Sequence, residues 1–143
     1  MNTSEILIPV RSYHADNHNH VNNARYLEFF EEGSWDFLKK NPNVGGLFET
    51  LIKRGVVHVV VNINCNYRNS AVMGDVLRLE TKLARSSEKS YTWSKKAYKN
   101  KTDKLVVDAE ITCVFINSVS GAVVPISDEM KSAWPALAKL KTN

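Results

Sequence analysis

The sequence predicts an α+β fold in which an antiparallel sheet packs on one long helix. Apolar side chains recur at helical spacing in one segment, from Asn23 to about Lys40. In four later segments they alternate with polar side chains, which is the period of half-buried strands. The links between these segments are short and favour antiparallel neighbours. Four strands with one apolar face each bury more surface than a single helix covers on a flat sheet, so we expect the sheet to curl around the helix or to pair with a second subunit.

Length and composition describe a single soluble domain over residues 1–143. With 43% hydrophobic and 24% charged residues, the chain is typical of globular proteins that fold without metal or disulfide staples. A net charge of +4 is too mild to indicate a nucleic-acid interface, and it suits a small polyanion such as a nucleotide-bearing cofactor equally well. We expect no membrane partner, because no segment approaches the ~20 apolar residues of a span and the N-terminus lacks a signal-peptide pattern. Cys65 and Cys113 lie in apolar alternating runs, so we expect buried free thiols, a reducing compartment and a cytoplasmic location.

The long helix has recognisable ends. Asn22 or Asn23 can cap its first turn through a side-chain oxygen, and Pro42 stops its continuation. Gly33 is small on a helix that is otherwise crowded with aromatic residues. We therefore expect another backbone to approach the helix closely at Gly33.

The remaining elements are strands and a short terminal helix. A first strand is expected over Ile6 to Arg11, followed by a polar loop, whereas the weakly patterned residues 43–54 predict no element. From Val57 to Tyr67 the odd positions are mainly apolar, which predicts a strand with one buried face. Further strands are expected near residues 77–83, 91–97 and 105–115, a hairpin turn at 99–104, and a terminal helix over Ser127 to Lys141, capped by Ser127 and interrupted at Pro135.

The polar loop before the helix contains the alternating residues His14, Asp16, His18 and His20, among them three of the four histidines of the chain. One hypothesis is a metal site, because imidazole and carboxylate groups bind zinc, nickel or iron. Another is a solvated loop without chemistry, since the intervening asparagines favour turns. A third makes Asp16 catalytic. The amide groups at a helix N-terminus stabilise an oxyanion, and a carboxylate beside them can attack a carbonyl or activate water, although a turn or capping aspartate explains Asp16 equally well.

The stretch VRSYHADNHNHVNNARYLEFFEEG, from Val10 to Gly33, resembles the signature of the hotdog-fold acyl-CoA thioesterases of the 4-hydroxybenzoyl-CoA thioesterase family. That signature joins an arginine-bearing strand, an aspartate loop, the sequence HVNN and an aromatic-rich helix. Further matches in family order extend the resemblance over roughly residues 5 to 127: Asn66-Tyr67, MGDVLRLET, Lys89-Ser90-Tyr91 and VFIN before Pro125. The resemblance implies five or six antiparallel strands wrapped around one central helix, edge-to-edge pairing into a homodimer or a dimer of dimers, and no cofactor or metal.

By the same resemblance, Asp16 matches the catalytic aspartate, which acts as nucleophile or as general base for water. The backbone N–H of Asn23 matches the oxyanion donor, and His20 orders the loop or helps to relay a proton. Two residues depart from the family pattern, because His14 replaces a first aspartate and Asn19 replaces a glycine. Asparagine accepts left-handed backbone, so the shape of the loop can survive. A histidine at position 14 places a titratable group near Asp16, and we expect an unusual pH dependence.

Five residues are candidates for binding substrate. The resemblance places Arg85, Lys89 and Ser90 where family members contact the nucleotide and phosphates of coenzyme A, with an ordinary solvated hairpin as the alternative. Tyr26, on the aromatic helix, can line an acyl pocket or simply belong to the core. His58 lies on the polar side of its strand, where a surface or interface residue is the alternative to a substrate contact.

The function implied by the resemblance is hydrolysis of an acyl-CoA thioester, with the acyl chain lying along the helix at a subunit interface. Two alternatives stay open. A hydratase or dehydratase on the same fold would use Asp16 and His20 as a pair acting on carbon, and a non-catalytic module would bind acyl-CoA without turnover. The sequence determines neither the acyl chain nor whether its carrier is coenzyme A or a carrier protein.

Overall fold

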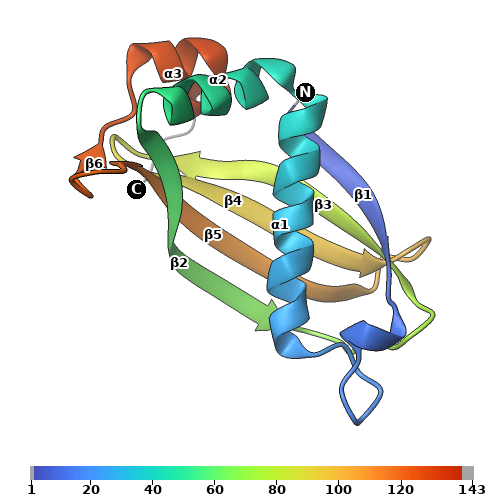
Figure 1. Ribbon diagram of the computed structural model, residues 1–143. Helices are drawn as coiled ribbons and strands as arrows, with labels where there is room; N and C mark the ends of the chain where they lie inside the picture. The colour runs from blue at the N-terminus through green and yellow to red at the C-terminus, as the bar shows by residue number, and fades with distance from the viewer. Residues whose placement is uncertain (1, 140–143) are drawn as a thin grey trace.

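The computed structural model describes residues 2–139 and shows a curved antiparallel sheet wrapped around one face of a long helix (Figure 1). The strand order is β1-β3-β4-β5-β2, and the short β6 pairs with β5. This arrangement confirms the predicted α+β class and the central helix. The strands are β1 (Thr3–Pro9), β2 (Val56–Tyr67), β3 (Val76–Ser86), β4 (Tyr91–Lys99), β5 (Leu105–Asn117) and β6 (Val123–Val124). The helices are the 3-10 turn η1 (Ser12–His14), α1 (Asn23–Lys40), α2 (Pro42–Lys53), α3 (Asp128–Ala133) and α4 (Ala136–Lys139).

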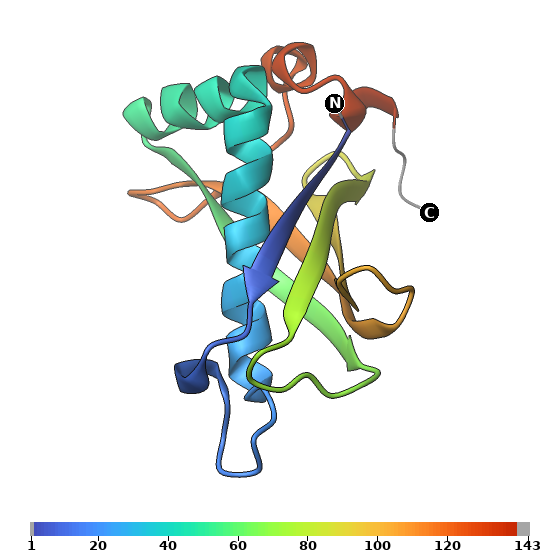
Figure 2. The same cartoon turned by 90° about the vertical axis from the view of Figure 1, so that its right-hand side faces the viewer.

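Helix α1 begins where the sequence predicts. The side chain of Asn22 accepts a hydrogen bond from the Ala24 amide, and Phe30 and Phe37 are each 1% exposed against the sheet. Figure 2 shows α1 running along the concave side of the sheet, with α2 and α3 gathered at its C-terminal end. Within residues 2–139, no helix has both the length and the apolar character that crossing a membrane requires.

Helix α2 is an element that the sequence prediction misses. The proline that ends α1 also starts α2, because a proline in the first helical position loses no hydrogen bond. Two adjacent glycines weaken the local helical signal, but four apolar residues at helical spacing are buried against the sheet and α3. Burial therefore decides the structure where local propensity does not. The buried residues are Val44, Leu47, Phe48 and Leu51.

Strand β2 corrects the prediction of a strand with one buried face. It forms one edge of the sheet, and none of its side chains is buried. A β-bulge between Val60 and Asn62 also shifts its register, so the residues facing the helix are His58 and Val60 before the bulge and Ile63 after it. Strict alternation cannot reveal a bulge. The large apolar residues that β2 exposes are Val60, Val61, Ile63 and Tyr67.

The C-terminal segment closes the end of the core near α2. Ser127 caps α3 by accepting a hydrogen bond from the Met130 amide, and the helix is interrupted near Pro135, as predicted. Trp134 is 3% exposed and packs its ring 5.2 Å from that of Trp93 and 5.9 Å from that of Phe37. The predicted extension to Lys141 lies outside the described residues.

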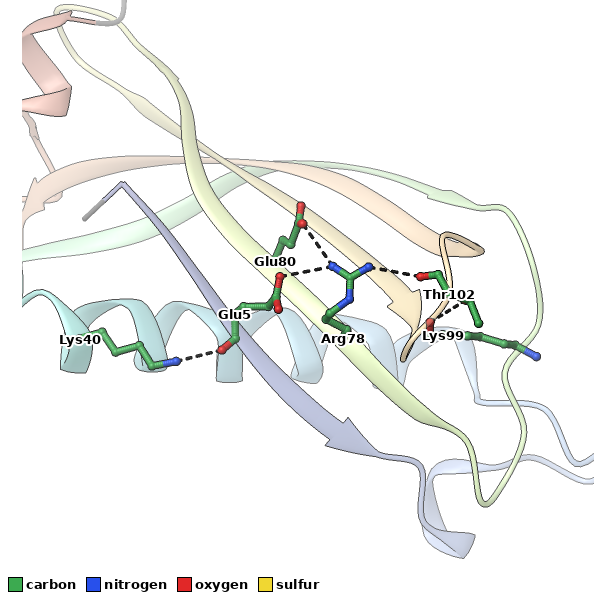
Figure 3. Close-up of polar contacts among 6 residues, drawn as sticks. All are labelled: Glu5, Lys40, Arg78, Glu80, Lys99 and Thr102. Atoms are coloured by element: carbon green, nitrogen blue, oxygen red, sulfur yellow. Dashed lines mark hydrogen bonds and ion pairs between the residues drawn. The ribbon is translucent and has the colours of Figure 1, made fainter.

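Strand β1, at the opposite edge, is held by polar contacts on the outer side of the sheet (Figure 3). Arg78 of β3 lies 3.3 Å from a carboxylate oxygen of Glu5 and 3.4 Å from one of Glu80, and it donates to the Thr102 carbonyl in the β4–β5 turn. Lys40 donates to the Glu5 carbonyl at 2.9 Å, which ties the end of α1 to β1. Exposed pairs of this kind contribute little individually, so they orient the edge more than they stabilise it.

A buried lysine lies where α1 meets the sheet. Lys95 of β4 is 0% exposed, and its Nζ donates to Ser34 Oγ at 2.6 Å and to Thr81 Oγ1 at 3.1 Å. The ammonium group also lies 5.0 Å from the centre of the Trp93 ring. No carboxylate in residues 2–139 forms an ion pair with Lys95, and burial lowers its pKa to about 7.

Gly33 makes room for this arrangement. A Cβ at Gly33 would lie 2.5 Å from Thr81 Oγ1, 2.8 Å from Leu79 Cδ2 and 3.4 Å from Lys95 Nζ. The predicted close approach is therefore present, but side chains of the sheet make it and not another backbone.

Gly33→Ala will destabilise the protein, although alanine is the better helix former. The added methyl group collides with Thr81 and Leu79, so we expect a loss of about 1 to 3 kcal/mol in the free energy of unfolding, measured by urea denaturation. Gly46→Ala in α2 is the matched control, because nothing lies within 4 Å of a Cβ there. It should gain about 0.5 to 1 kcal/mol. Unchanged stability of Gly33→Ala would contradict the close approach.

Lys95→Met will remove a pH-dependent part of the stability. The pKa of Lys95 is about 7 in the folded protein against an ordinary value of 10.5, so between these values the unfolded chain binds more protons and stability rises with pH. From pH 7 to pH 9 we expect the free energy of unfolding of the wild type to gain about 2 kcal/mol relative to Lys95→Met. Lys96→Met, on the exposed side of the same strand, should follow the wild type. A difference that stays constant across this range would refute a lowered pKa.

Candidate active site

The loop before α1 folds as a small hairpin. The Asp16 amide donates to the His20 carbonyl at 2.8 Å, and the Asn22 amide donates to the His14 carbonyl at 2.9 Å. Asn19, at the tip, has a φ of 61°, the left-handed backbone that asparagine tolerates. In this hairpin Asp16 faces His20, and His14 faces Asn22, the N-cap of α1. Asp16 therefore lies two residue pairs beyond the start of the helix.

The Asp16 carboxylate is exposed, and one of its two oxygens accepts hydrogen bonds from the backbone of its own turn. Its Oδ1 accepts the backbone N–H of His18 at 2.9 Å and that of His20 at 3.3 Å. The hydrogen bond from His18 lowers the pKa of Asp16 below its usual value, and the bond from His20 adds to this effect, whereas desolvation opposes it. The Oδ2 atom accepts no hydrogen bond from residues 2–139. Asp16 is therefore charged at neutral pH and has one oxygen available for chemistry.

The first amide of α1 is also available. Asn22 uses its side chain to satisfy the Ala24 amide at 2.9 Å, whereas the Asn23 amide meets no acceptor in the described part of the chain. The Asn23 carbonyl accepts a hydrogen bond from the Tyr67 hydroxyl at 3.2 Å, which fixes this end of the helix to β2. An open N–H at the positive end of an 18-residue helix favours a developing negative charge.

A largely apolar groove of about 230 Å³ runs between α1 and β2. His58, Val60 and Ile63 form its β2 side, and residues of α2, β4 and β5 form its floor. Its α1 side includes a stripe of residues three or four apart, beginning one turn after Asn23: Leu27, Glu31, Trp35 and Leu38. The groove therefore follows α1 from one turn after the open amide toward the C-terminal end of the helix.

His58 lines this groove, although the sequence assigns it to the polar side of its strand. The bulge in β2 turns it inward, where its ring lies 4.9 Å from that of Phe48. Desolvation lowers the pKa of His58, and the nearby Glu31 opposes this effect. Glu31, Ser34 and Tyr91 are polar groove residues that sequence reasoning missed, because only the fold brings them to one surface.

Tyr26 lies elsewhere. It is 3% exposed, packs against Phe29 and Tyr67 and does not line the groove. Burial raises the pKa of Tyr26 to about 12, so its hydroxyl stays protonated. The structure thus places Tyr26 in the core, which is the alternative that the sequence leaves open.

The three candidate phosphate contacts lie at the other end of the sheet. Lys89 and Ser90 belong to the tight β3–β4 turn, in which the hydroxyls of Ser87 and Ser90 are 2.7 Å apart. Arg85 forms an ion pair with Glu110. Figures 1 and 2 show this hairpin near α3 and the loop before α1 at the opposite end of the molecule. One chain therefore does not bring these residues together with Asp16.

His14 makes its contacts with residues other than Asp16. Its Nδ1 accepts the Arg11 amide at 2.8 Å, and its ring packs 4.9 Å from that of Phe29. Desolvation and then the charge of Arg25 lower the pKa of His14, whereas the histidine charges near Asp16 are those of His18 and His20. Within residues 2–139, no three His, Cys, Asp or Glu side chains gather closely enough to hold a metal ion.

Comparison with known proteins assigns the family. Residues 10–134 match the sequence profile of the Thioesterase-like superfamily. The chain belongs to this superfamily. It is 36% identical over 132 residues to the long-chain acyl-CoA thioesterase FadM of Escherichia coli (strain K12), covering 92% of this chain and 97% of FadM.

Solved structures agree with this assignment. The probable thioesterase YbaW of Escherichia coli has a TM-score of 0.81 and 34% identity, with 96% of this chain and 98% of YbaW covered. A 4-hydroxybenzoyl-CoA thioesterase variant, solved with 4-hydroxybenzoyl-CoA, shares the fold at 17% identity, with a TM-score of 0.79 over 93% of this chain and 99% of its own. The predicted hotdog fold and the predicted thioesterase family are confirmed.

Replacing Arg25 with Met will raise the pKa of His14, because it removes a nearby positive charge and leaves Glu28 unpaired. Asp16→Asn should leave the pKa of His14 unchanged. Titration of the imidazole signals by NMR measures both effects. If Asp16→Asn shifted the pKa of His14 while Arg25→Met did not, His14 and Asp16 would be coupled as the sequence suggested.

Proposed function

We propose that the protein hydrolyses long-chain acyl-CoA thioesters to a free carboxylic acid and coenzyme A. One observation carries this proposal: a loop with a charged carboxylate that has an open oxygen leads into the N-terminal end of α1 (Figure 1), where an amide has no acceptor, and the same helix forms one side of an apolar groove. The likeness to FadM, which is named a long-chain acyl-CoA thioesterase, supports the substrate class.

Hydrolysis needs only groups that this chain supplies. The thioester carbonyl oxygen accepts a hydrogen bond from the Asn23 amide, where the partial positive charge of the helix end stabilises the oxyanion. Asp16 either attacks the carbonyl carbon, giving an anhydride that water then opens, or removes a proton from the attacking water. In both routes the C–S bond breaks and the thiolate of coenzyme A leaves. The backbone amide of His20 orders the carboxylate, and the His20 side chain is the candidate to relay a proton.

The groove fits the acyl chain. From Asn23 to Leu38 the helix rises by about 22 Å, so a chain anchored at the amide can extend over the whole stripe. Leu27, Trp35 and the inward side chains of β2 surround such a chain with apolar contacts. Burying methylene groups there supplies binding energy at about 0.8 kcal/mol for each group.

We further propose that two copies pair through β2. This edge strand has 12 residues and leaves Val60, Val61 and Ile63 between 42% and 55% exposed. A long apolar edge invites association, and pairing with a second copy covers it. The open side of the groove follows the same edge, so the partner would close it.

Antiparallel pairing also explains the separation of the candidate residues. A two-fold axis across β2 reverses the direction of the partner, so the Asp16 end of one subunit meets the β3–β4 hairpin end of the other. The partner's Lys89 and Ser90, together with its Arg85, would then hold the phosphates of coenzyme A beside Asp16.

Cys65 and Cys113 are both free thiols, which suits the cytoplasmic location that we propose.

Asp16→Asn and Asp16→Ala will each lower kcat by about a hundredfold or more, because the first removes the charge while keeping the shape and the second removes both. Thiol release from acyl-CoAs ranging from acetyl to palmitoyl, with benzoyl added, measures this loss. Asp103→Asn, in the exposed β4–β5 turn, should retain wild-type activity. If the wild type binds the panel without releasing thiol, the protein is a binding module. Addition of water to an enoyl-CoA would identify a hydratase.

A further inference from the structure

The buried amine of Lys95 calls for an explanation that packing does not provide. A lysine without a carboxylate partner is costly to bury, and an apolar side chain would fill the same space at lower cost. The chain nevertheless adapts to it, because Gly33 interrupts a helix of bulky residues where Thr81 and Lys95 approach. A glycine within a helix is itself unfavourable by about 0.5 to 1 kcal/mol relative to alanine.

Lys95 connects with the groove through Ser34. The Ser34 hydroxyl accepts the hydrogen bond from Lys95 Nζ at 2.6 Å, and both Ser34 and Trp93, on which the amine rests, line the groove. Ser34 also donates to the Phe30 carbonyl, but at 3.4 Å this bond is long. A polar ligand atom that reached Ser34 could accept a hydrogen bond from its hydroxyl in place of the Phe30 carbonyl.

A second polar group, on a side chain that lines this groove, has no oxygen or nitrogen partner in residues 2–139. The Tyr91 hydroxyl forms no hydrogen bond with any oxygen or nitrogen of residues 2–139, although Tyr91 is 0% exposed and lines the groove. Only the thiol of Cys113, a weak partner, faces it. A purely hydrocarbon ligand would leave the Ser34 hydroxyl facing apolar groups, and this is unfavourable for a polar atom that the ligand buries.

We propose that Ser34 and Lys95 form a recognition point for an oxygen atom, a hydroxyl or a keto group, on the acyl chain of the substrate. This inference rests on the proposed thioesterase function and narrows its substrate class to oxygenated long-chain acyl groups. The oxygen accepts a hydrogen bond from the Ser34 hydroxyl, which Lys95 polarises from behind. Lys95 acts through Ser34 and is therefore a positioning residue.

The helix indicates where on the chain this oxygen lies. Ser34 follows Asn23 by 11 residues, which is about 16 Å along the axis at 1.5 Å for each residue. An extended polypeptide reaches about 1.2 Å for each backbone bond, and an extended acyl chain advances by about the same amount. About 13 bonds of the acyl chain therefore cover that distance. The recognised oxygen therefore belongs near carbons 12 to 14, far from the thioester.

The test compares octadecanoyl-CoA with its 12-hydroxy and 3-hydroxy derivatives. We expect the wild type to favour the 12-hydroxy compound at least tenfold in kcat/KM, and the 3-hydroxy compound not at all. Lys95→Met and Ser34→Ala should each bring the ratio of 12-hydroxy to plain substrate close to one. Two variants are used so that a folding defect in Lys95→Met does not decide the result. Lys96→Met, on the exposed side of β4, should keep the wild-type ratio.

Binding separates this inference from the proposed function. The Asp16→Asn protein, which the proposal makes inactive, should bind the 12-hydroxy compound at least tenfold more tightly than octadecanoyl-CoA, measured by calorimetry. Equal affinities, or a preference that survives in the Asp16→Asn/Ser34→Ala double variant, would overturn the recognition of an oxygen. Equal turnover of all three compounds would overturn it while leaving the thioesterase in place. A wild type that binds with this preference but releases no thiol would instead remove the proposed hydrolysis.

Discussion

The close packing of α1 on the sheet at Gly33 is the constraint on which the rest of the structure depends. The sheet can curl around the helix only because Thr81 and Leu79 occupy the space that a side chain at Gly33 would fill. With the helix held there, its N-terminus and its groove-facing stripe have fixed positions relative to β2. The open amide and the groove are therefore placed by one helix, and the hairpin that carries Asp16 leads directly into its first turn.

The groups proposed to react are those whose hydrogen-bonding capacity the local structure leaves unused. Asn22 satisfies the Ala24 amide and not its neighbour, so the Asn23 amide stays open. The Oδ1 atom of Asp16 accepts hydrogen bonds from the backbone of its own turn, whereas Oδ2 accepts none from residues 2–139. The loop is thereby held by hydrogen bonds of the same residues that serve the proposed chemistry, which reduces the reorganisation needed when substrate binds.

Sequence reasoning succeeded where the structure is determined locally or by a specific motif. The bounds of α1 follow from its cap and from Pro42, and the family follows from the stretch around Asp16. It failed where distant contacts decide. Helix α2 is stabilised by burial, and the bulge in β2 moves His58 to the inner face without a trace in the alternation. Lys95 occupies an apolar position of its strand, but only the fold shows that it meets Ser34.

Helix α2 lies at the C-terminal end of α1 (Figure 2) and contributes Phe48, which packs beside His58, to the floor of the groove. The groups proposed to break the thioester lie at the other end of α1, more than a dozen residues away along the helix. In the proposed mechanism, selection of chain length and bond cleavage thus belong to separate parts of the molecule. A shift of α2 would lengthen or shorten the accepted chain without touching the groups proposed to cleave it. Such modularity would let one fold serve several substrates.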